Sequence, residues 1–358
     1  MTGGYLVLEN GTVFDGELFG ADIEKAGEVV FSTGGVDGYQ EMITNPSNKG
    51  KILVLTYPLV GNYGVSDQFN ESDRVHVSGI VVCEVCSEPS PYYNGTLLAD
   101  FMAEKGAVGI QGVDTRELTL LLRKNGKMKG KIVKEGADID KVVKSLKDES
   151  IDMSVKDVSP KQVTKINNGK DVTVGVIDCG SGFGFYEALA ERFNVIKFPY
   201  DTKADAILKE GVKGVIVSNG PGCPCDKCLE PTVETVRELT SKLPVMGVSL
   251  GSEILAIALG AKLEPMKLGH HGCNQPVKIN GRICMTTQSQ DYCIVPSSVE
   301  AAGIIITQTN LNDEVIEGFA HKEKSVCGFE YNPEGGTGQG DTVFLYDDFL
   351  NLIKGASQ

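Results

Sequence analysis

Residues 244–260 read PVMGVSLGSEILAIALG, and this stretch decides the fold of the second half of the chain. Residues 244–248 form an apolar run without helical period, whereas apolar residues recur at the spacing of one helix face from Gly251 onward. The turn between them, residues 247–251, places one polar side chain between glycines where a strand passes into a helix. This layout is typical of a nucleophile elbow, whose helix N-terminus points toward developing negative charge. Ser249 is therefore the candidate nucleophile.

The segments around this elbow alternate in type. After residue 171, short apolar strands alternate with helical segments, which favours a parallel sheet covered by helices on both faces. Sites in such sheets lie beyond the carboxyl ends of the strands, and glycine-rich turns follow two of them, at 218–222 and 247–251. In the first half, residues 114–126 read DTRELTLLLRKNG, a helix that begins after Asp114 or Thr115 and ends at Gly126.

The composition is acidic. The 358-residue chain has a formal net charge of −14, which would repel phosphate backbones and anionic membranes. We therefore expect neither nucleic acid nor a membrane as a partner. The N-terminus lacks a basic segment followed by an apolar core, and no apolar run approaches the roughly 20 residues of a membrane span. We expect a cytoplasmic protein whose ten cysteines are mostly free thiols.

Several motifs occur in a fixed order along the second half: SNGPG at 218–222, GVSLG at 247–251, LGHHGCNQPV at 268–277 and NPE at 332–334. In this order they resemble the class I (triad) glutamine amidotransferases. The first half carries GEVVFST, GYQEMITNPS, LTYPLVGNYG and DTRELTLLLR, which resemble the amino-terminal domain of the small subunit of carbamoyl-phosphate synthetase. The resemblance covers nearly the whole chain.

The resemblance implies an activity and a partner. In that family the small subunit hydrolyses glutamine and passes ammonia through a tunnel to a large subunit of the ATP-grasp type, which makes carbamoyl phosphate for the pyrimidine and arginine pathways. An elbow cysteine attacks the glutamine amide with help from a histidine that a glutamate orients, and the GPG loop helps to stabilise the oxyanion. A neutral nucleophile without a base cannot open a stable carboxamide, so the thiolate and imidazole are needed together.

This sequence departs from the family at two triad positions. The elbow carries Ser249 in place of the cysteine, and Asn332 stands where the family has the histidine of an HPE motif, so that only Glu334 is retained. A serine hydroxyl is far less acidic than a thiol and depends more on a base, and an asparagine cannot accept and return a proton at neutral pH. We predict that Ser249, Asn332 and Glu334 are vestigial triad positions without glutaminase activity.

The substrate pocket is altered as well. Where the family has CLGHQ, residues 249–253 read SLGSE, and where it has QNHGF, residues 288–292 read QSQDY. Relative to these family motifs, the chain has two additional carboxylates, those of Glu253 and Asp291. We expect both to face the pocket and to repel a substrate carboxylate or an oxyanion. Ser47 matches a glutamine-binding position of the family, as do two glycines of the GPG loop. The predicted glutamine-pocket positions are Ser47, Gly220, Gly222, Leu250, Glu253, Ser289, Asp291 and Tyr292.

The elbow also matches G-x-S-x-G, the signature of serine hydrolases. Such an enzyme needs a downstream histidine, and the candidates are His270, His271 and His321. In the resemblance the first two belong to the family's own GHHG turn, and His321 precedes the last strand, away from the elbow. Residual amidohydrolase or serine hydrolase activity through Ser249 is the alternative hypothesis.

The cysteines suggest a second alternative. Residues 223–228 read CPCDKC directly after the GPG loop, and residues 83–86 read CEVC. Thiolates at such spacings can share a zinc ion or an iron–sulfur cluster. However, Pro224 stiffens the first pair, and the second motif falls in the other domain. We predict no metal and no cofactor; a thiol- or metal-based sensor would use Cys223, Cys225 and Cys228.

The main hypothesis is non-enzymatic. We predict an α/β chain with a mixed N-terminal α/β domain over residues 1–150, a linker over 151–170, and a class I amidotransferase-like domain over 171–358 with a mostly parallel sheet flanked by helices. Its glutaminase centre is disabled, and it acts as a structural or regulatory partner of a large synthetase subunit that takes ammonia from solution.

Overall fold

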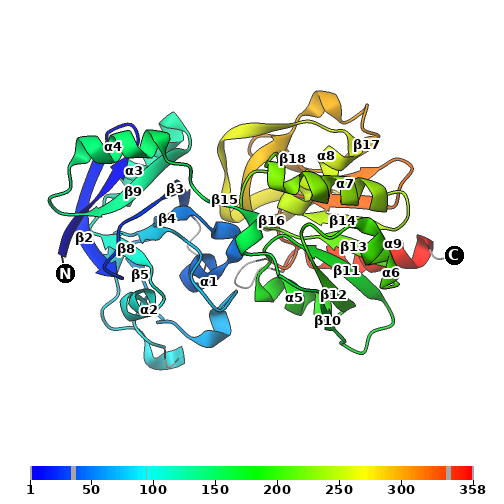
Figure 1. Ribbon diagram of the computed structural model, residues 1–358, viewed down its shortest axis with the longest axis horizontal. Helices are drawn as coiled ribbons and strands as arrows, with labels where there is room; N and C mark the ends of the chain where they lie inside the picture. The colour runs from blue at the N-terminus through cyan, green and yellow to red at the C-terminus, as the bar shows by residue number, and fades with distance from the viewer. Residues whose placement is uncertain (1, 34–37, 94, 336–339, 357–358) are drawn as a thin grey trace. The chain divides into compact units, whose positions relative to one another are not determined.

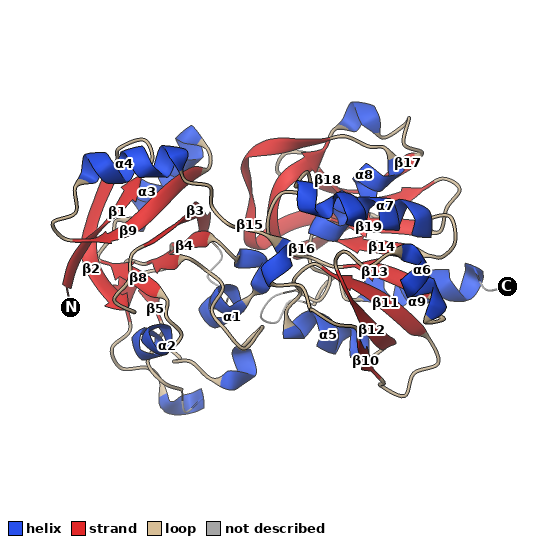
Figure 2. Ribbon diagram, viewed as in Figure 1, coloured by secondary structure: helices blue, strands red, loops and turns tan. Residues whose placement is uncertain are grey.

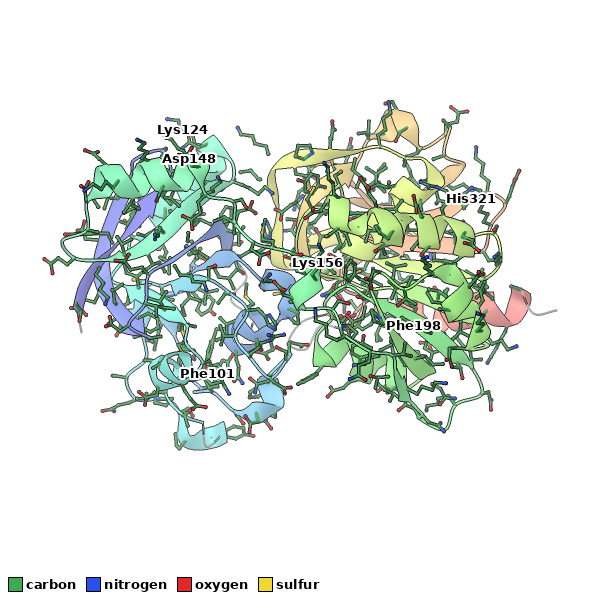
Figure 3. All side chains as sticks on the ribbon, viewed as in Figure 1. Phe101, Lys124, Asp148, Lys156, Phe198 and His321 are labelled. Carbon is green, nitrogen blue, oxygen red and sulfur yellow. The ribbon has the colours of Figure 1, made fainter. Side chains whose placement is uncertain are left out.

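The computed structural model describes residues 2–33, 38–93, 95–335 and 340–356 (Figure 1). The chain divides into a first unit, Met1–Met153, and a second unit, Ser154–Gln358. Each unit has hydrophobic cores of its own, which include Phe101 in the first unit and Phe198 in the second (Figure 3). None of the helices in the described ranges has the length and apolar character needed to cross a membrane.

A closed barrel with strand order β1-β2-β8-β6-β4-β3-β9 forms the first unit. All five residues of β4 (Lys51–Leu55) are buried: Ile52 and Val54 join a core drawn from all seven strands, while Leu53 and Leu55 pack outside the barrel with residues of α1 and α2. A strand covered on both faces needs such a continuous apolar run. The remaining elements are β1 (Thr2–Leu8), β2 (Val13–Gly20), β3 (Lys25–Ser32), α1 (Tyr39–Thr44), β5 (Leu59–Val60), β6 (Gly79–Val81), β7 (Glu84–Val85), α2 (Leu98–Glu104), β8 (Val108–Gln111), α3 (Thr115–Asn125), β9 (Met128–Lys134) and α4 (Ile139–Asp148).

Helix α3 confirms the predicted helix of the first half. The Asp114 side chain accepts a hydrogen bond from the backbone N–H of Glu117 at 2.8 Å, and the helix ends at Gly126, whose φ of +89° favours glycine. Leu118 and Leu122, one turn apart, bury their side chains in the barrel core.

A ten-stranded sheet with order β10-β12-β11-β13-β14-β19-β18-β17-β15-β16 organises the second unit. Five strands that are consecutive in the sheet pair in parallel, as the alternation of strands and helices predicted: β12, β11, β13, β14 and β19. Helices cover both faces (Figure 2): α6, α7 and α8 share one core, and α5 and α9 share the other. The elements are β10 (Thr164–Ile166), β11 (Thr173–Asp178), α5 (Phe183–Ala190), β12 (Asn194–Pro199), α6 (Ala204–Lys209), β13 (Gly214–Val217), α7 (Glu230–Leu239), β14 (Val245–Val248), α8 (Leu250–Leu259), β15 (Leu263–Ile279), β16 (Arg282–Ile294), β17 (Ile304–Asn310), β18 (Ile316–His321), β19 (Val326–Phe329) and α9 (Phe344–Ala356).

The segment predicted as a linker, residues 151–170, differs from that prediction in its C-terminal half. Thr164–Ile166 forms β10, which pairs antiparallel with β12 at the edge of the large sheet. An edge strand has one neighbour and here keeps two of its three residues exposed, so its sequence carries no apolar period. The second unit begins at Ser154, so most of this segment belongs to it.

Candidate functional site

The predicted elbow is present. Strand β14 ends at Val248, α8 begins at Leu250, and Ser249 between them has φ +50° and ψ −119°, a conformation that L-residues rarely adopt. The Ser249 backbone N–H donates to the carbonyl of Phe329 at 2.7 Å, which fixes the turn to the adjacent strand β19. The side chain of Leu250, a predicted pocket residue, is buried in the core. Leu250 could therefore contact a ligand only through its backbone.

Two glycines let this turn form. A Cβ atom on Gly251 would lie 2.0 Å from the carbonyl oxygen of Val217, and one on Gly247 would lie 2.6 Å from the carbonyl oxygen of Gly251. Helix α8 therefore lies so close to the ends of β13 and β14 that a Cβ atom at position 247 or 251 would clash with backbone. The flanking glycines predicted from the sequence are a steric requirement of the elbow.

The triad positions are not connected by hydrogen bonds. Within the described residues, neither the Ser249 hydroxyl nor the Asn332 amide group has a side-chain hydrogen-bond partner, whereas the Asn332 backbone N–H donates to the Thr287 carbonyl at 3.2 Å. Glu334, the retained carboxylate, accepts a hydrogen bond at 2.6 Å from the hydroxyl of Tyr346 on α9. Burial, and then the charge of Glu334, raise the pKa of Tyr346 well above its usual range, so this hydroxyl stays a donor.

The GPG loop follows β13 at residues 218–222. The Ser218 hydroxyl accepts a hydrogen bond at 2.9 Å from the N–H of Cys179, at the end of β11. A Cβ atom on Gly220 would lie 2.3 Å from the carbonyl oxygen of Cys179, and Gly222 has φ +92°. The loop therefore depends on both glycines and is held beside the carboxyl end of the parallel sheet.

Sequence reasoning missed the buried carboxyl of Glu330. This residue follows β19, is 1% exposed, and accepts a hydrogen bond at 2.9 Å from the hydroxyl of Ser252 on α8. Burial, followed by the charge of Glu253, raises the pKa of Glu330 well above its usual range. The available signal was an acidic residue directly after an apolar strand, just before the NPE motif.

The two introduced carboxylates have different surroundings. Glu253 lies in the first turn of α8, 5% exposed, and its charge acts on both Glu330 and Cys225. Asp291 on β16 contacts His271, with 3.1 Å between Oδ1 and Nε2. One Asp291 oxygen is therefore used within the β15–β16 hairpin, and that both carboxylates repel a substrate stays a prediction.

Other predicted pocket residues divide between the units. Ser289 and Tyr292 lie on β16 in the second unit, with Ser289 opposite His271 in the strand register. Ser47 lies in the first unit, where its N–H donates to the side chain of Asn45 at 2.9 Å. Its role in glutamine binding stays a prediction.

The cysteines after the GPG loop face two different surroundings. The Tyr292 hydroxyl is hydrogen-bonded to Cys223, and burial followed by this bond raises the pKa of Tyr292. Cys225 is close to Cys223 and Glu253, whereas Cys228 is near Ser154 and Lys156. In the described ranges no three or more His, Cys, Asp or Glu side chains are grouped so that they could hold a metal ion, and all ten thiols are free.

The candidate histidines of a serine hydrolase are used elsewhere. His270 lies 3.1 Å from Glu317 through Nδ1 and 2.8 Å from Asp313 through Nε2, and the Nδ1 of His321 accepts backbone N–H groups of Glu323 and Lys324. Among the described residues, none of the histidines is hydrogen-bonded to Ser249.

The ion pairs of His270 predict a pH dependence of stability. Burial alone would lower its pKa, but the hydrogen bonds and charges of Glu317 and Asp313 outweigh burial and raise the pKa to about 9. The stabilisation is therefore complete below the unfolded value of about 6.5 and is lost as the pH rises through about 9. We therefore expect the melting temperature of the native chain, measured by circular dichroism, to fall between pH 6.5 and 9. In the His270→Gln variant this fall should be smaller. His321→Gln is the control, and an unchanged slope in His270→Gln would contradict the assignment.

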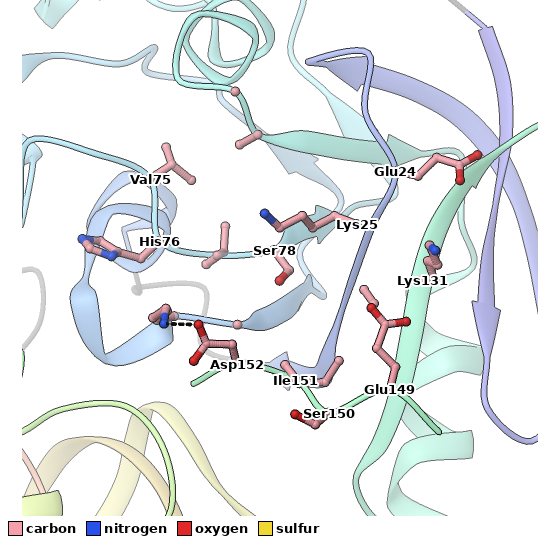
Figure 4. A pocket seen from close by; sticks show the side chains of 16 residues that line it. Glu24, Lys25, Val75, His76, Ser78, Lys131, Glu149, Ser150, Ile151 and Asp152 are labelled. Carbon is pink, nitrogen blue, oxygen red and sulfur yellow. Dashed lines mark hydrogen bonds and ion pairs between the residues drawn. The ribbon is translucent and has the colours of Figure 1, made fainter. Parts of the chain in front are cut away.

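A separate hollow of about 400 Å³ lies within the first unit (Figure 4). Its charged lining comprises three lysines and three carboxylates, Lys25, Lys49, Lys131, Glu24, Glu149 and Asp152, and Lys49 and Asp152 form an ion pair at 2.8 Å. These charges balance, so the lining selects no ligand charge, and none of the predicted site residues contributes to it.

Comparison with known proteins adds the following. The family described as "Carbamoyl-phosphate synthase small chain, CPSase domain" matches residues 6–132, and "Glutamine amidotransferase class-I" matches residues 175–352. Three proteins named carbamoyl phosphate synthase small chain are similar to this chain over nearly their whole length. The protein from Bacillus cereus is 38% identical over 98% of this chain and 95% of its own, and the one from Archaeoglobus fulgidus is 38% identical over 98% of each. The protein from Listeria monocytogenes is 39% identical over 100% of this chain and 99% of its own. A solved glutamine amidotransferase from Thermotoga maritima aligns with a TM-score of 0.39 at 18% identity over 51% of this chain and 85% of its own.

Proposed function

The chain belongs to the carbamoyl-phosphate synthase small-chain family, and from this premise we propose that it is a small subunit that does not hydrolyse glutamine. It binds a large synthase subunit of the ATP-grasp type and stabilises or regulates it, while ammonia comes from solution. We assign this assembly to the cytoplasm and to the supply of carbamoyl phosphate for pyrimidine or arginine synthesis.

The observation that carries the proposal is the absence of a base at the elbow. Ser249 has the strained backbone of a nucleophile, but its hydroxyl has no hydrogen-bond partner among the described residues. Asn332 occupies the position of the family's histidine and cannot carry a proton between nucleophile and leaving group at neutral pH. General acid–base catalysis alone contributes about 10²–10⁴-fold to such reactions, and replacement of the thiol removes the better nucleophile as well.

The partner role is supported by the extent of the family match. The chain covers 95–99% of the length of the small-chain relatives reported above, with both domains present.

Two measurements test the proposal. We expect the purified chain, alone and with its large subunit, to release glutamate from glutamine no faster than the Ser249→Ala variant, in a coupled glutamate dehydrogenase assay. We also expect a large subunit from the same cells to co-purify with the tagged chain, and the complex to use ammonium salts as its nitrogen source. Glutamate release that disappears in Ser249→Ala would overturn the inactive assignment, and failure of the large subunit to bind would overturn the partner role.

The strained geometry of Ser249 favours one second candidate, a residual hydrolase. The same assay, with a p-nitrophenyl ester in place of glutamine, addresses it: turnover that depends on Ser249 would support the hydrolase.

A further inference from the structure

Two cysteines share one tight turn directly after the GPG loop. The carbonyl of Cys223 accepts the backbone N–H of Asp226 at 3.0 Å, which closes a β-turn with Pro224 at its second position. Proline fixes its own φ near the value that this position requires, so the turn is preorganised. Cys223 and Cys225 therefore occupy the first and third positions of a stiff turn.

The side chain of Cys223 is folded over the backbone of Cys225. The backbone N–H of Cys225 donates to the Sγ atom of Cys223 at 3.3 Å. Because the N and Cα atoms of one residue are about 1.46 Å apart, this sulfur lies within about 5 Å of the Cα atom of Cys225. Two consecutive Cα steps of about 3.8 Å that bend through a turn end within the range of about 4.4–6.8 Å that disulfides span. Rotation about the Cα–Cβ bond of Cys225 then brings the two sulfur atoms together.

The pair is open to a reagent from solution. Cys225 is exposed and Cys223 is partly exposed. Desolvation of the sulfur atom, followed by the charge of Cys223 and a hydrogen bond to it, raises the pKa of Cys225. These surroundings do not stabilise the thiolate, and a reduced form that lacks this stabilisation gives way more readily to the disulfide.

The third cysteine of the CPCDKC motif has other neighbours. Cys228 packs against the core that α7 and α8 share and lies near Ser154 and Lys156. In the part of the chain that the structure describes, no third His, Cys, Asp or Glu side chain joins Cys223 and Cys225 in a group that could hold a metal ion. Zinc and iron–sulfur sites need more than two protein ligands, so the pair matches a disulfide better than a metal.

We propose that Cys223 and Cys225 form a reversible disulfide, with a low-molecular-weight disulfide such as glutathione disulfide as the oxidant. One cysteine thiolate attacks a sulfur atom of the oxidant, which forms a mixed disulfide and releases one small thiol. The other cysteine thiolate then attacks the cysteine sulfur of this mixed disulfide and displaces the second small thiol. The cysteine pair thereby loses two electrons and two protons, which reduce the oxidant to two thiols.

The disulfide would change a contact between two elements of the second unit. Cys223 follows Gly222 of the GPG loop, and its thiol is hydrogen-bonded to the hydroxyl of Tyr292 on β16. Oxidation removes the hydrogen atom of this thiol, so that only the Tyr292 hydroxyl can then donate the hydrogen bond. The inference goes beyond the proposed function and does not rest on it, since neither Ser249 nor Asn332 takes part.

Peptide mapping of the full chain tests the disulfide. The native chain is equilibrated at increasing ratios of oxidised to reduced glutathione, quenched with acid and labelled with N-ethylmaleimide. Trypsin then releases residues 214–227 as one peptide that contains Cys223 and Cys225, whereas Cys228 begins the next peptide. As the ratio rises, we expect the first peptide to lose both labels and two hydrogen atoms in its mass spectrum. Dithiothreitol should restore both labels.

Matched variants and unfolding locate the effect. Cys225→Ser should carry glutathione at Cys223 in place of the internal disulfide. Cys228→Ser is the control, and its peptide should be half oxidised at the same glutathione ratio as the native peptide. In the native chain unfolded by urea, this ratio should rise by about tenfold, because the folded turn no longer holds the two thiols together.

Three results would overturn the proposal. The first is a peptide 214–227 that keeps its labels, or carries only glutathione, at every ratio. The second is a cross-link between this peptide and the next that disappears in Cys228→Ser. The third is an unchanged half-oxidation ratio in urea. The native chain alone supplies the first and third results, so the test stands even if a variant fails to fold.

Discussion

Replacement of Gly251 by alanine is expected to lower the free energy of unfolding of the second unit by about 4 kcal/mol or more. Losses of this size are exceptional for single substitutions and arise from causes such as overpacking of the core. The new Cβ atom would lie 2.0 Å from the Val217 carbonyl oxygen and 2.8 Å from the Ser218 carbonyl oxygen. Both contacts are to backbone at the end of β13, a central strand that pairs with β11 and β14, so neither atom can move away cheaply.

Urea unfolding followed by circular dichroism measures this effect. Gly355→Ala is the matched control, because Gly355 also lies in a helix but a Cβ atom there meets nothing within 4 Å. We expect the control to be neutral or slightly stabilising, since alanine favours helices over glycine by about 1 kcal/mol. Equal midpoints for the two variants would show that the close packing of α8 on β13 is not required.

Restoration of the triad is expected to leave the chain a poor glutaminase. The double variant Ser249→Cys with Asn332→His supplies a thiol and an imidazole, but Glu253 and Asp291 remain at the positions predicted to contact substrate. We expect its kcat/KM for glutamine to stay at least about 100-fold below that of an active small-chain relative assayed in parallel, because the pocket still opposes the substrate's negative charge.

The four-residue variant, which adds Glu253→Gln and Asp291→Gly, should recover a substantial part of this deficit, mainly through KM. The matched control adds Glu234→Gln to the double variant and should change nothing, because Glu234 is exposed on α7. Full activity in the double variant alone would mean that the pocket never lost its affinity for glutamine. The activity of the double variant, the four-residue variant and the control is measured as glutamate release in the coupled glutamate dehydrogenase assay.

Local signals in the sequence were enough for several elements. The elbow was predictable because a strand, a turn and a helix that are consecutive in the chain each carry their own pattern, and because two glycines mark the close approach. Helix α3 was predictable for the same reason, since Asp114 and Gly126 cap it within its own segment. The edge strand Thr164–Ile166 was not, because a short polar strand is defined by its neighbour β12.

The sequence by itself determined the family, the order of the two domains and the identities of Ser249 and Asn332 at the triad positions, since these are properties of ordered motifs. Tertiary structure alone decided the surroundings of those positions. Ser252 and Glu330 are separated by 78 residues in the chain yet share a hydrogen bond. Helix α8 packs against β16 and β19, and this packing buries Glu330 near Glu253. Burial and the neighbouring charge together raise the pKa of Glu330, and residues adjacent in the sequence do not encode either effect.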